Sequence, residues 1–445
     1  MKQKSFPYKS LSVIAVSIFI LSTCYFCTTN DEATDLYMSQ MEYKNNEKLT
    51  ICSKSSFKGL KQVRIFNALD NTLLEEINIQ SSSTVTQPVS QETANDNCDG
   101  FEVATFDLAN KGNGLYFIEF NDSKERQFFI QREILKPETD CKIGVVFPNF
   151  TWQAYNAYGG ASLYSIPPPE SGVSVKRPLK NPEKYHRPEA TLSFIQVLLQ
   201  EKKCFVPLSN SGMNANLDWQ TLDLIILTGH DEYWTEEMME SITSWVNGGG
   251  KLAVFSGNTA WWRLGVHGNL IRREGYWHKT QTPEESLTGL SFRFAGYPIK
   301  RRFSEEKTAR EAGLSPNVYE QSGGMQVIDA NHPIFHATDL KNADWFGKST
   351  DLVAVEVDGI PIDENSHALK TKATMAFPEN IQILASGWAH RKNFHHVGMI
   401  VDFSLGKGHV VNAGSIGWFQ SLENNSVTQK IFTNTIDYLY PENTL

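Results

Sequence analysis

The 445-residue sequence lacks an excess of positive charge. Its 41 Lys and Arg residues are outnumbered by 50 Asp and Glu residues, and the formal net charge is −9. Such a chain builds no general basic field, so we expect no nucleic-acid partner. Internal repeats and low-complexity tracts are also absent. The 40% of hydrophobic residues is ordinary for a globular protein and predicts a sizeable buried core.

Cysteine is scarce as well, with six residues in the whole chain. Cys24 and Cys27 lie in the N-terminal segment, and the other four lack the CxxC spacing of zinc sites. In an oxidising compartment these four can form two disulfides, in any of three pairings. We therefore expect structural bridges or buried thiols rather than catalytic groups at Cys52, Cys98, Cys141 and Cys204.

Signatures of nucleophilic hydrolases are missing too. No Gly-x-Ser-x-Gly surrounds Ser256, and Cys204 lacks the Cys-x-Gly elbow of a glutamine-amidotransferase nucleophile.

The adjacent His395 and His396 would point to opposite faces of a strand, so they do not easily share a metal. The short basic run at 300–302 is typical of a solvated face.

The N-terminus carries a targeting segment, expected at 1–27. A basic stretch at 1–9 precedes an apolar stretch at 11–21, which is short for a membrane span and typical of a signal peptide. The following Leu-Ser-Thr-Cys at 21–24 resembles a bacterial lipobox, and a plain cleaved signal or an uncleaved anchor stays open. We expect an exported protein, periplasmic, secreted or lipid-anchored, that meets the membrane only through this segment.

The remaining chain divides into two parts after a polar linker at 28–45. Between 46 and 138, short strands alternate with turn-forming stretches and no helical period appears, which predicts an immunoglobulin-like all-β sandwich. From 139 to 445, strands alternate with helices, as in the apolar strand at 222–228 and the helix at 235–247. This alternation predicts an α/β domain with an open, mostly parallel sheet of the glutamine-amidotransferase or flavodoxin-like kind.

Polar clusters follow four of the predicted strands, at 149–164, 229–234, 256–258 and 412–418. Because ligands of open α/β sheets bind outside the carboxyl ends of the strands, we expect these clusters to face one crevice. The corresponding pocket residues are Asp231, Tyr233, Trp234, Trp152, Asn156, Ser415 and Trp418.

The cluster at 229–234 carries the richest chemistry. His230, Asp231 and Glu232 in a row are costly to bury unless they are solvated, paired or bound to a metal. The two acids also suit the N-terminus of the helix that begins near Thr235. A capping role does not require a His, two acids, a Tyr and a Trp together, so the pattern favours a functional site.

These segments resemble the motif set of the N,N-dimethylformamidase large (beta) subunit family, in its C-terminal catalytic region. The resemblance covers about residues 115 to 440 with the motifs in the same order, and the hexapeptide around Glu232 is its most specific part. It implies a mononuclear iron held by two tyrosines and one glutamate, and the hydrolysis of a small N-substituted amide. Phenolate and carboxylate oxygens are hard ligands that suit ferric iron.

The resemblance maps the glutamate onto Glu232 and one tyrosine onto Tyr155. It places the second tyrosine at Tyr116 by approximate spacing, although Tyr116 also suits a structural position in the sandwich. The alternatives for this ligand are Tyr158, Tyr164 and Tyr185. His230 and Asn258 match pocket positions of the family, which implies catalytic roles for them beside Glu232.

We therefore expect an exported, iron-dependent hydrolase of an amide or related C–N bond in a small organic substrate. The characterised member of the family is intracellular and works with a small partner subunit. Because this chain carries an export segment, we expect a substrate other than dimethylformamide. Two interpretations stay open beside it: a cell-surface protein that binds a glycan or small molecule without catalysis, and a structural module. Each of these three interpretations is compatible with a protein that forms a homo-oligomer.

Overall fold

The structure is a computed structural model that describes residues 36–38, 41–44, 47–53, 60–80, 102–108, 111–120, 126–132, 141–175, 177, 179, 188–295, 323–353, 356–361, 376–388 and 397–441. The expected targeting segment at 1–27 lies outside these residues, as does most of the linker at 28–45. So do Cys98, Tyr185, the basic run at 300–302 and the histidine pair at 395–396.

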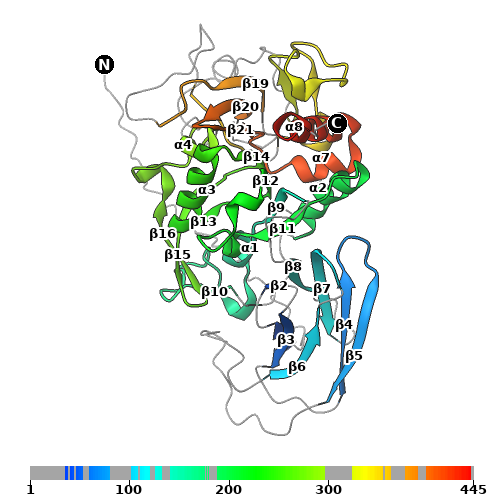
Figure 1. Ribbon diagram of the computed structural model, residues 1–445. Coiled ribbons are helices and arrows are strands. Elements are labelled where there is room, and N and C mark those ends of the chain that lie inside the picture. Colours follow the sequence, from blue (N-terminus) through cyan, green and yellow to red (C-terminus); the bar gives the residue numbers. More distant parts are fainter. Residues whose placement is uncertain are drawn as a thin grey trace, which may run out of the picture. The chain divides into compact units, whose positions relative to one another are not determined.

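Two sheets form the N-terminal part of the described chain (Figure 1). The three-stranded sheet has the order β1-β3-β6, and the five-stranded sheet has the order β2-β8-β7-β4-β5. Their strands are β1 (Leu36–Met38), β2 (Glu42–Lys44), β3 (Lys48–Ser53), β4 (Leu60–Asn67), β5 (Leu73–Gln80), β6 (Glu102–Asp107), β7 (Gly114–Phe120) and β8 (Arg126–Arg132). Leu49 and Ile51 of one sheet share an apolar core with Val63 and Ile65 of the other, as a two-sheet sandwich requires.

A nine-stranded sheet forms the centre of the rest, in the order β11-β9-β12-β14-β21-β20-β19-β17-β18. The first five strands are parallel: β11 (Val206–Ser209), β9 (Ile143–Phe147), β12 (Leu224–Gly229), β14 (Lys251–Ser256) and β21 (Gly408–Asn412). The other four pair antiparallel: β20 (Val397–Leu405), β19 (Gln382–Trp388), β17 (Met325–Val327) and β18 (Trp345–Phe346).

The sheet is thus mixed, and the expectation of a mostly parallel sheet holds for one half only. The connection between β20 and β21 explains the change of direction. It consists of Gly406 and Lys407 alone, and a two-residue connection joins only antiparallel strands. The turn also needs a positive φ, which Gly406 supplies at 60°.

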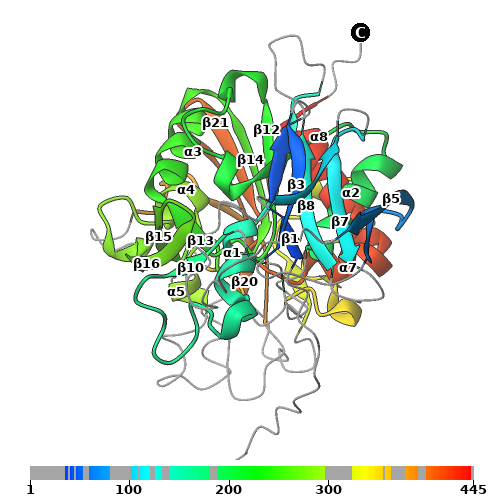
Figure 2. The same cartoon turned by 90° about the horizontal axis from the view of Figure 1, so that it is seen from below.

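Helices cover both faces of the nine-stranded sheet (Figures 1 and 2). On one side lie α2 (Glu189–Gln200), α7 (Trp418–Asn424) and α8 (Ser426–Leu439), and on the other lies α3 (Glu236–Gly248). Leu224 and Ile226 of β12 belong to the first core, whereas Ile225 and Leu227 belong to the second. Burial on both faces accounts for the unbroken apolar run of this strand.

A small sheet and three short helices lie near the carboxyl ends of the parallel strands. The sheet has the order β10-β16-β15-β13, with β10 (Val173–Ser174), β13 (Tyr233–Thr235), β15 (Trp262–His267) and β16 (Leu270–Tyr276). The helices are α1 (Asn149–Tyr155), α4 (Glu285–Thr288) and α5 (Phe292–Ala295). In the described part of the chain, none of the helices has the length and apolar character needed to cross a bilayer.

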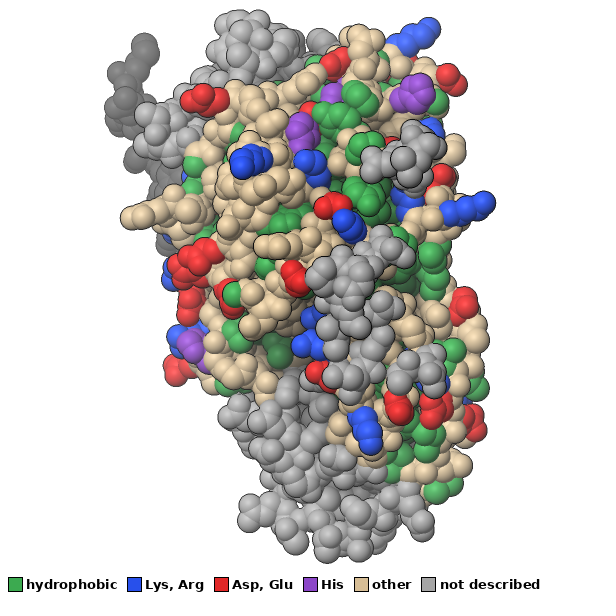
Figure 3. Space-filling model, in the orientation of Figure 1, with side chains coloured by type: hydrophobic (Ala, Val, Ile, Leu, Met, Phe, Trp, Pro, Cys, Tyr) green, Lys and Arg blue, Asp and Glu red, His purple; other side chains and the backbone are tan. Residues whose placement is uncertain are grey.

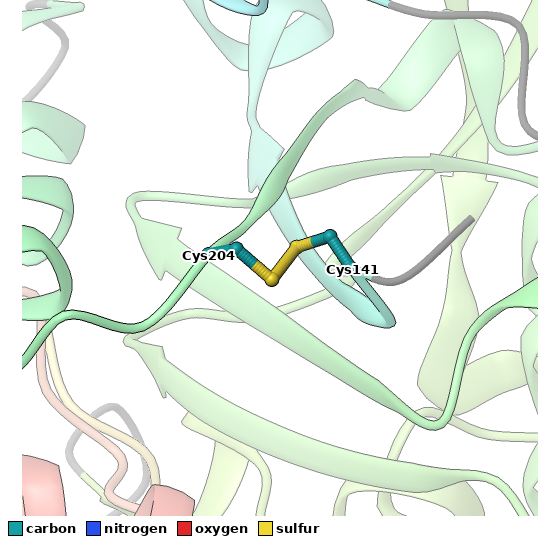
Figure 4. Close-up of a disulfide and its surroundings, with 2 residues drawn as sticks. All are labelled: Cys141 and Cys204. Carbon is teal, nitrogen blue, oxygen red and sulfur yellow. A yellow bond between two sulfur atoms is a disulfide. The ribbon is translucent and has the colours of Figure 1, made fainter.

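Cys141 and Cys204 form a disulfide with a Cα–Cα distance of 5.6 Å (Figure 4). The bond joins the segments that enter the neighbouring strands β9 and β11, and it excludes the other two pairings of Cys141. Cys52 is disulfide-bonded as well. The expectation of structural bridges is confirmed for these three residues. A loop of this length closed in the unfolded chain stabilises the fold by about 4 kcal/mol in the chain-entropy model.

Lys and Arg side chains are scattered among Asp and Glu over the described part of the face in Figure 3.

One acidic group, Asp402 of β20, is buried between histidines. Its carboxylate lies 2.6 Å from Nε2 of His409 and 3.3 Å from Nε2 of His332, and it accepts a 3.2 Å hydrogen bond from Tyr438. Burial raises the pKa of Asp402, but the contacts with the two histidines outweigh burial and hold it at about 2.

A carboxyl whose pKa is lower in the folded state stabilises the fold above its unfolded pKa, here 3.8, and the stabilisation is lost as the pH falls toward 2. We expect Asp402→Asn to lower the free energy of unfolding at neutral pH by about 1–2 kcal/mol, measured by urea denaturation. The difference from the parent protein should shrink below pH 3.8. An equal loss in the exposed control Asp218→Asn would contradict this role.

Candidate functional site

The carboxyl ends of β9, β12 and β14 place the candidate residues together. Helix α1 follows β9 and ends at Tyr155, and Gly229 turns the chain at the end of β12 with a φ of 71°. Asn258 follows β14 with a φ of 55°, a left-handed conformation that Asn tolerates better than most residues. Three of the four polar clusters expected to face one crevice, at 149–164, 229–234 and 256–258, contribute residues to this common site.

The carboxylate of Glu232 is the centre of this place. Tyr155 donates a 2.8 Å hydrogen bond to its Oε2, and Tyr164 donates to both oxygens at 2.9 and 2.8 Å. The two phenol rings stack with centroids 4.2 Å apart. Glu232 itself is only 2% exposed. Two phenol oxygens therefore converge on one buried carboxylate.

A second carboxylate, that of Glu356, lies beside the first. Nε2 of His230 is 2.7 Å from Oε2 of Glu356 and 3.7 Å from Oε2 of Glu232. Nδ2 of Asn258 donates to Glu232 at 3.0 Å and to Glu356 at 3.1 Å. Both N–H groups of this amide are thus used between the two acids. Its Oδ1 is buried, and no hydrogen-bond partner for it lies among the described residues.

Burial governs the charges at this site. It raises the pKa of Glu232 to about 7, with Glu356 adding to the shift and His230 opposing it. Burial also disfavours the charged form of His230, but Glu356 and Glu232 outweigh it and raise its pKa to about 9. Burial and the charge of Glu232 raise the pKa values of Tyr155 and Tyr164 well above the ordinary range. Without a cation, both phenols keep their protons.

The backbone around Glu232 and Asn258 is held by buried polar groups. The hydroxyl of Thr151 accepts from the amides of Glu232 and Tyr233 at 3.0 and 3.3 Å. The carboxylate of Asp358 accepts from the amides of Asn258 and Thr259 at 2.8 and 3.1 Å. A Cβ at Gly257 would lie 2.3 Å from the carbonyl oxygen of Glu356, so only glycine permits this approach.

The loop that carries both phenols is fixed by Arg177, which is 8% exposed. Its guanidinium donates to five carbonyl oxygens, those of Ser174, Tyr158, Ala161, Gln153 and Asn156, at 2.7–3.2 Å. Burial lowers the pKa of Arg177 to about 10. Because the carbonyls flank Tyr155 and Tyr164, this one cation sets the spacing of the two phenols.

The structure does not bring every expected residue to this centre. Tyr116 lies in β7, and its hydroxyl donates to the carbonyl oxygens of Lys111 and Gly112 within the sandwich. Tyr158 is buried, and its carbonyl oxygen accepts a hydrogen bond from Arg177. Tyr164, named only as an alternative, therefore replaces Tyr116 as the second tyrosine of the candidate set.

Several expected pocket residues are core residues instead. Trp152 packs against Phe147, Trp418 packs against Phe255, and Trp234 is fully buried. Large apolar rings gain most from such burial, which the aromatic content of a motif does not reveal. Three other expected pocket residues form hydrogen bonds with neighbouring groups of the protein. Asp231 accepts from Asn210, Asn156 donates to Gln153, and Ser415 donates to the carbonyl of Leu352. Tyr233, bonded to Arg273, stays at the site.

Sequence reasoning missed Glu356, Asp358 and Arg177. Glu356 and Asp358 come from a stretch with no strand or helix pattern, which reaches the site because Val357 pairs with Ser415. Arg177 had no distinguishing signal, because it stands beside Lys176 in a polar stretch after the aromatic segment at 149–164. No signal distinguished Tyr164 from its neighbours, because the fold of the loop decides which phenol meets Glu232.

Comparison with known proteins gives the family. A family model described as N,N-dimethylformamidase beta subunit-like, C-terminal, matches residues 70–430, and the chain belongs to this family. The match confirms the resemblance drawn from the motifs. The family takes its name from an amide-hydrolysing enzyme. No curated protein matches the sequence.

Solved structures with some similarity are longer glycosidases. They include a β-galactosidase from Rahnella sp. R3 (11% identity, TM-score 0.34, covering 68% of this chain and 31% of that chain). Another is a β-galactosidase from Bacillus circulans sp. alkalophilus (10%, 0.34, 68% and 31%). A third is the exo-β-1,4-mannosidase Op5Man5 from Opitutaceae bacterium strain TAV5 (8%, 0.31, 68% and 36%). The chain spans about a third of their length, and similarity of this size supports no conclusion on fold or function.

The role of Arg177 can be tested without knowing the reaction. We expect Arg177→Lys, which keeps the charge but supplies fewer donors, to lower the free energy of unfolding by about 2–4 kcal/mol. Amide hydrogen exchange in 153–165 should speed up selectively. Arg272→Lys, at an exposed ion pair with Glu274, serves as the matched control. Unchanged exchange in 153–165 would refute the assignment.

Proposed function

We propose that the protein is an exported, metal-dependent hydrolase that cleaves an amide or related C–N bond of a small organic substrate. The observation that supports it most is the convergence of the Tyr155 and Tyr164 hydroxyls on the Glu232 carboxylate. We further propose that these three residues hold a mononuclear iron, with Tyr164 in the place first assigned to Tyr116.

The donor set fits a cation of high charge. The phenol–carboxylate oxygen distances of 2.8–2.9 Å are those of hydrogen bonds, and they bring two phenols and one carboxylate close enough to share a cation once the phenols lose their protons. Two phenolates and one carboxylate offset the charge of ferric iron. Among the described residues, His, Cys, Asp and Glu alone make no group of three suited to a metal. A metal at this site therefore depends on the tyrosines.

A bound iron would supply a Lewis acid that polarises the amide carbonyl and acidifies a water molecule. The chain itself would handle the protons. Glu356 can accept the proton of the water, and the protonated His230, 2.7 Å away, can give its own proton to the leaving nitrogen and recover one from Glu356. The water oxygen bonds to the carbonyl carbon, and the C–N bond breaks with its electron pair on nitrogen, which takes the proton.

The geometry changes the role proposed for Asn258. Its two N–H groups already span Glu232 and Glu356, so it holds the two carboxylates apart rather than donating to an oxyanion. Its Oδ1 remains available as an acceptor. We propose that Oδ1 receives a hydrogen bond from the water or from the N–H of the substrate.

Export is supported by the disulfide between Cys141 and Cys204, because such bonds persist in oxidising compartments. We further propose that residues 1–27 act as the signal, 46–138 form an immunoglobulin-like sandwich, and 139–445 form the catalytic part. The parallel strands, numbered along the chain, lie in the order 2-1-3-4-5, which supports a flavodoxin-like arrangement for that half.

Iron binding provides the direct test. We expect the iron-loaded protein to show a visible tyrosinate-to-iron charge-transfer band and to bind one iron per chain. Glu232→Gln should lower iron occupancy at least tenfold, and Tyr164→Phe should weaken and shift the band. Tyr116→Phe, a phenol of the sandwich, is the matched control and should leave both unchanged.

The outcomes also separate the proposal from a protein that only binds a glycan or small molecule. Saturable binding without turnover, unaffected by chelators, would favour the binding protein. A folded protein that takes up no iron would contradict the metal-dependent hydrolase. Loss of the band in Tyr116→Phe but not in Tyr164→Phe would restore the first assignment of the second tyrosine.

A further inference from the structure

Arg273 of β16 is held against the candidate site by aromatic side chains. Its guanidinium carbon lies 4.0 Å from the ring centroid of Tyr164 and 4.2 Å from that of Trp262. Nε and Nη2 donate to the Tyr233 hydroxyl at 2.8 and 2.5 Å. Strands β13, β15 and β16 lie in one small sheet, so Tyr233, Trp262 and Arg273 have a common framework (Figures 1 and 2).

No carboxylate among the described residues forms an ion pair with Arg273. Its neighbours behave differently, because Arg263 and Arg272 both pair with Glu274, at 3.7 and 3.6 Å. An arginine that meets a carboxylate usually forms a short charge-assisted pair with it. Arg273 is fixed by stacking and by a neutral phenol, and Glu232 acts on its charge without forming an ion pair with it.

The hydrogen-bonding capacity of Arg273 is also only partly used. A guanidinium has five N–H groups, and Tyr233 takes one on Nε and one on Nη2. The other three belong to the end of the guanidinium, formed by Nη1 and Nη2. Arg273 is only partly buried, which leaves room for a ligand beside the guanidinium. A free end of this shape matches the two oxygens of a carboxylate.

Tyr164 connects this arginine to the reactive centre. Its hydroxyl donates to Glu232, and its ring, 39% exposed, lies under the guanidinium. Tyr164 therefore contacts both the guanidinium of Arg273 and the carboxylate of Glu232. A small molecule that presents an amide at Glu232 can place a second group near Arg273.

We infer that Arg273 binds a carboxylate of the substrate, and that the substrate class is an acylated amino acid or a similar small amide with a nearby carboxylate. The inference rests on the proposed function, which places the amide at Glu232. Stacking between Tyr164 and Trp262 fixes the direction of the guanidinium, so the arginine selects by geometry as well as by charge.

Arg273 has a rival role within the site, since its charge also favours the ionised forms of Tyr164 and Tyr233. That role would affect charged and neutral ligands alike. Recognition of a carboxylate instead predicts a difference between two ligands that share the amide and differ in charge. N-acetylglycine and N-acetylglycinamide form such a pair of probes.

The test measures binding of both probes to the full-length mature protein by calorimetry. We expect N-acetylglycine to bind at least tenfold more tightly than N-acetylglycinamide. Arg273→Gln should reduce this ratio to about one, and Arg273→Lys, which keeps the charge without the planar fork, should give an intermediate ratio. Arg272→Gln removes the same charge from the adjacent residue of the strand and should preserve the full ratio.

The inference is overturned if the parent protein does not prefer the carboxylate probe, or if Arg273→Gln keeps the preference. Failure of the proposed function gives a different result. In that case the carboxylate preference and its loss in Arg273→Gln persist, but no iron binds and no amide is cleaved. Hydrolysis of neutral amides with an unchanged rate in Arg273→Gln would support the function and reject the inference.

Discussion

The structure depends on the burial of one carboxylate, that of Glu232, between two phenols. A buried carboxylate is costly unless its oxygens accept hydrogen bonds, and here Tyr155, Tyr164 and Asn258 supply them. The two phenols come from the segment 149–164 and Asn258 follows β14, so two separate segments have to be fixed. Arg177 fixes the phenols, and Asp358 fixes the amide of Asn258. The polar network around the site follows from this single requirement.

Much of the site could be predicted because strand ends gather at one edge of a sheet. The apolar run before Gly229 and the helix after it were both found, and Thr235 caps that helix through a 3.2 Å bond from the amide of Met238. His230, Glu232 and Asn258 then came together as expected. The feature that made this possible is local: an apolar strand, a polar turn and a capped helix are legible in a short stretch of sequence.

What escaped prediction is decided by contacts between distant segments. Glu356 reaches the site from an irregular stretch, and no periodicity marks it. The choice between Tyr116 and Tyr164 depends on the path of a loop that one buried arginine holds. Tryptophans near glycines suggested a pocket, yet Trp152 and Trp418 fill the core, because composition does not tell an aromatic wall from an aromatic core. The antiparallel half of the sheet begins at the two-residue turn between β20 and β21, which the pattern of apolar residues does not reveal.

The position of β21 has a consequence for the order in which the protein is built. This strand follows β14 in the sequence only after a long intervening segment, but it lies in the interior of the sheet, between β14 and β20. Until it is synthesised, β14 presents a bare edge with unpaired amides and carbonyls. The stretch that carries Glu356 also lacks its support at Ser415 until then. A nascent chain therefore lacks a finished centre until β21 and Ser415 have been made, and only then can the reactive groups assemble.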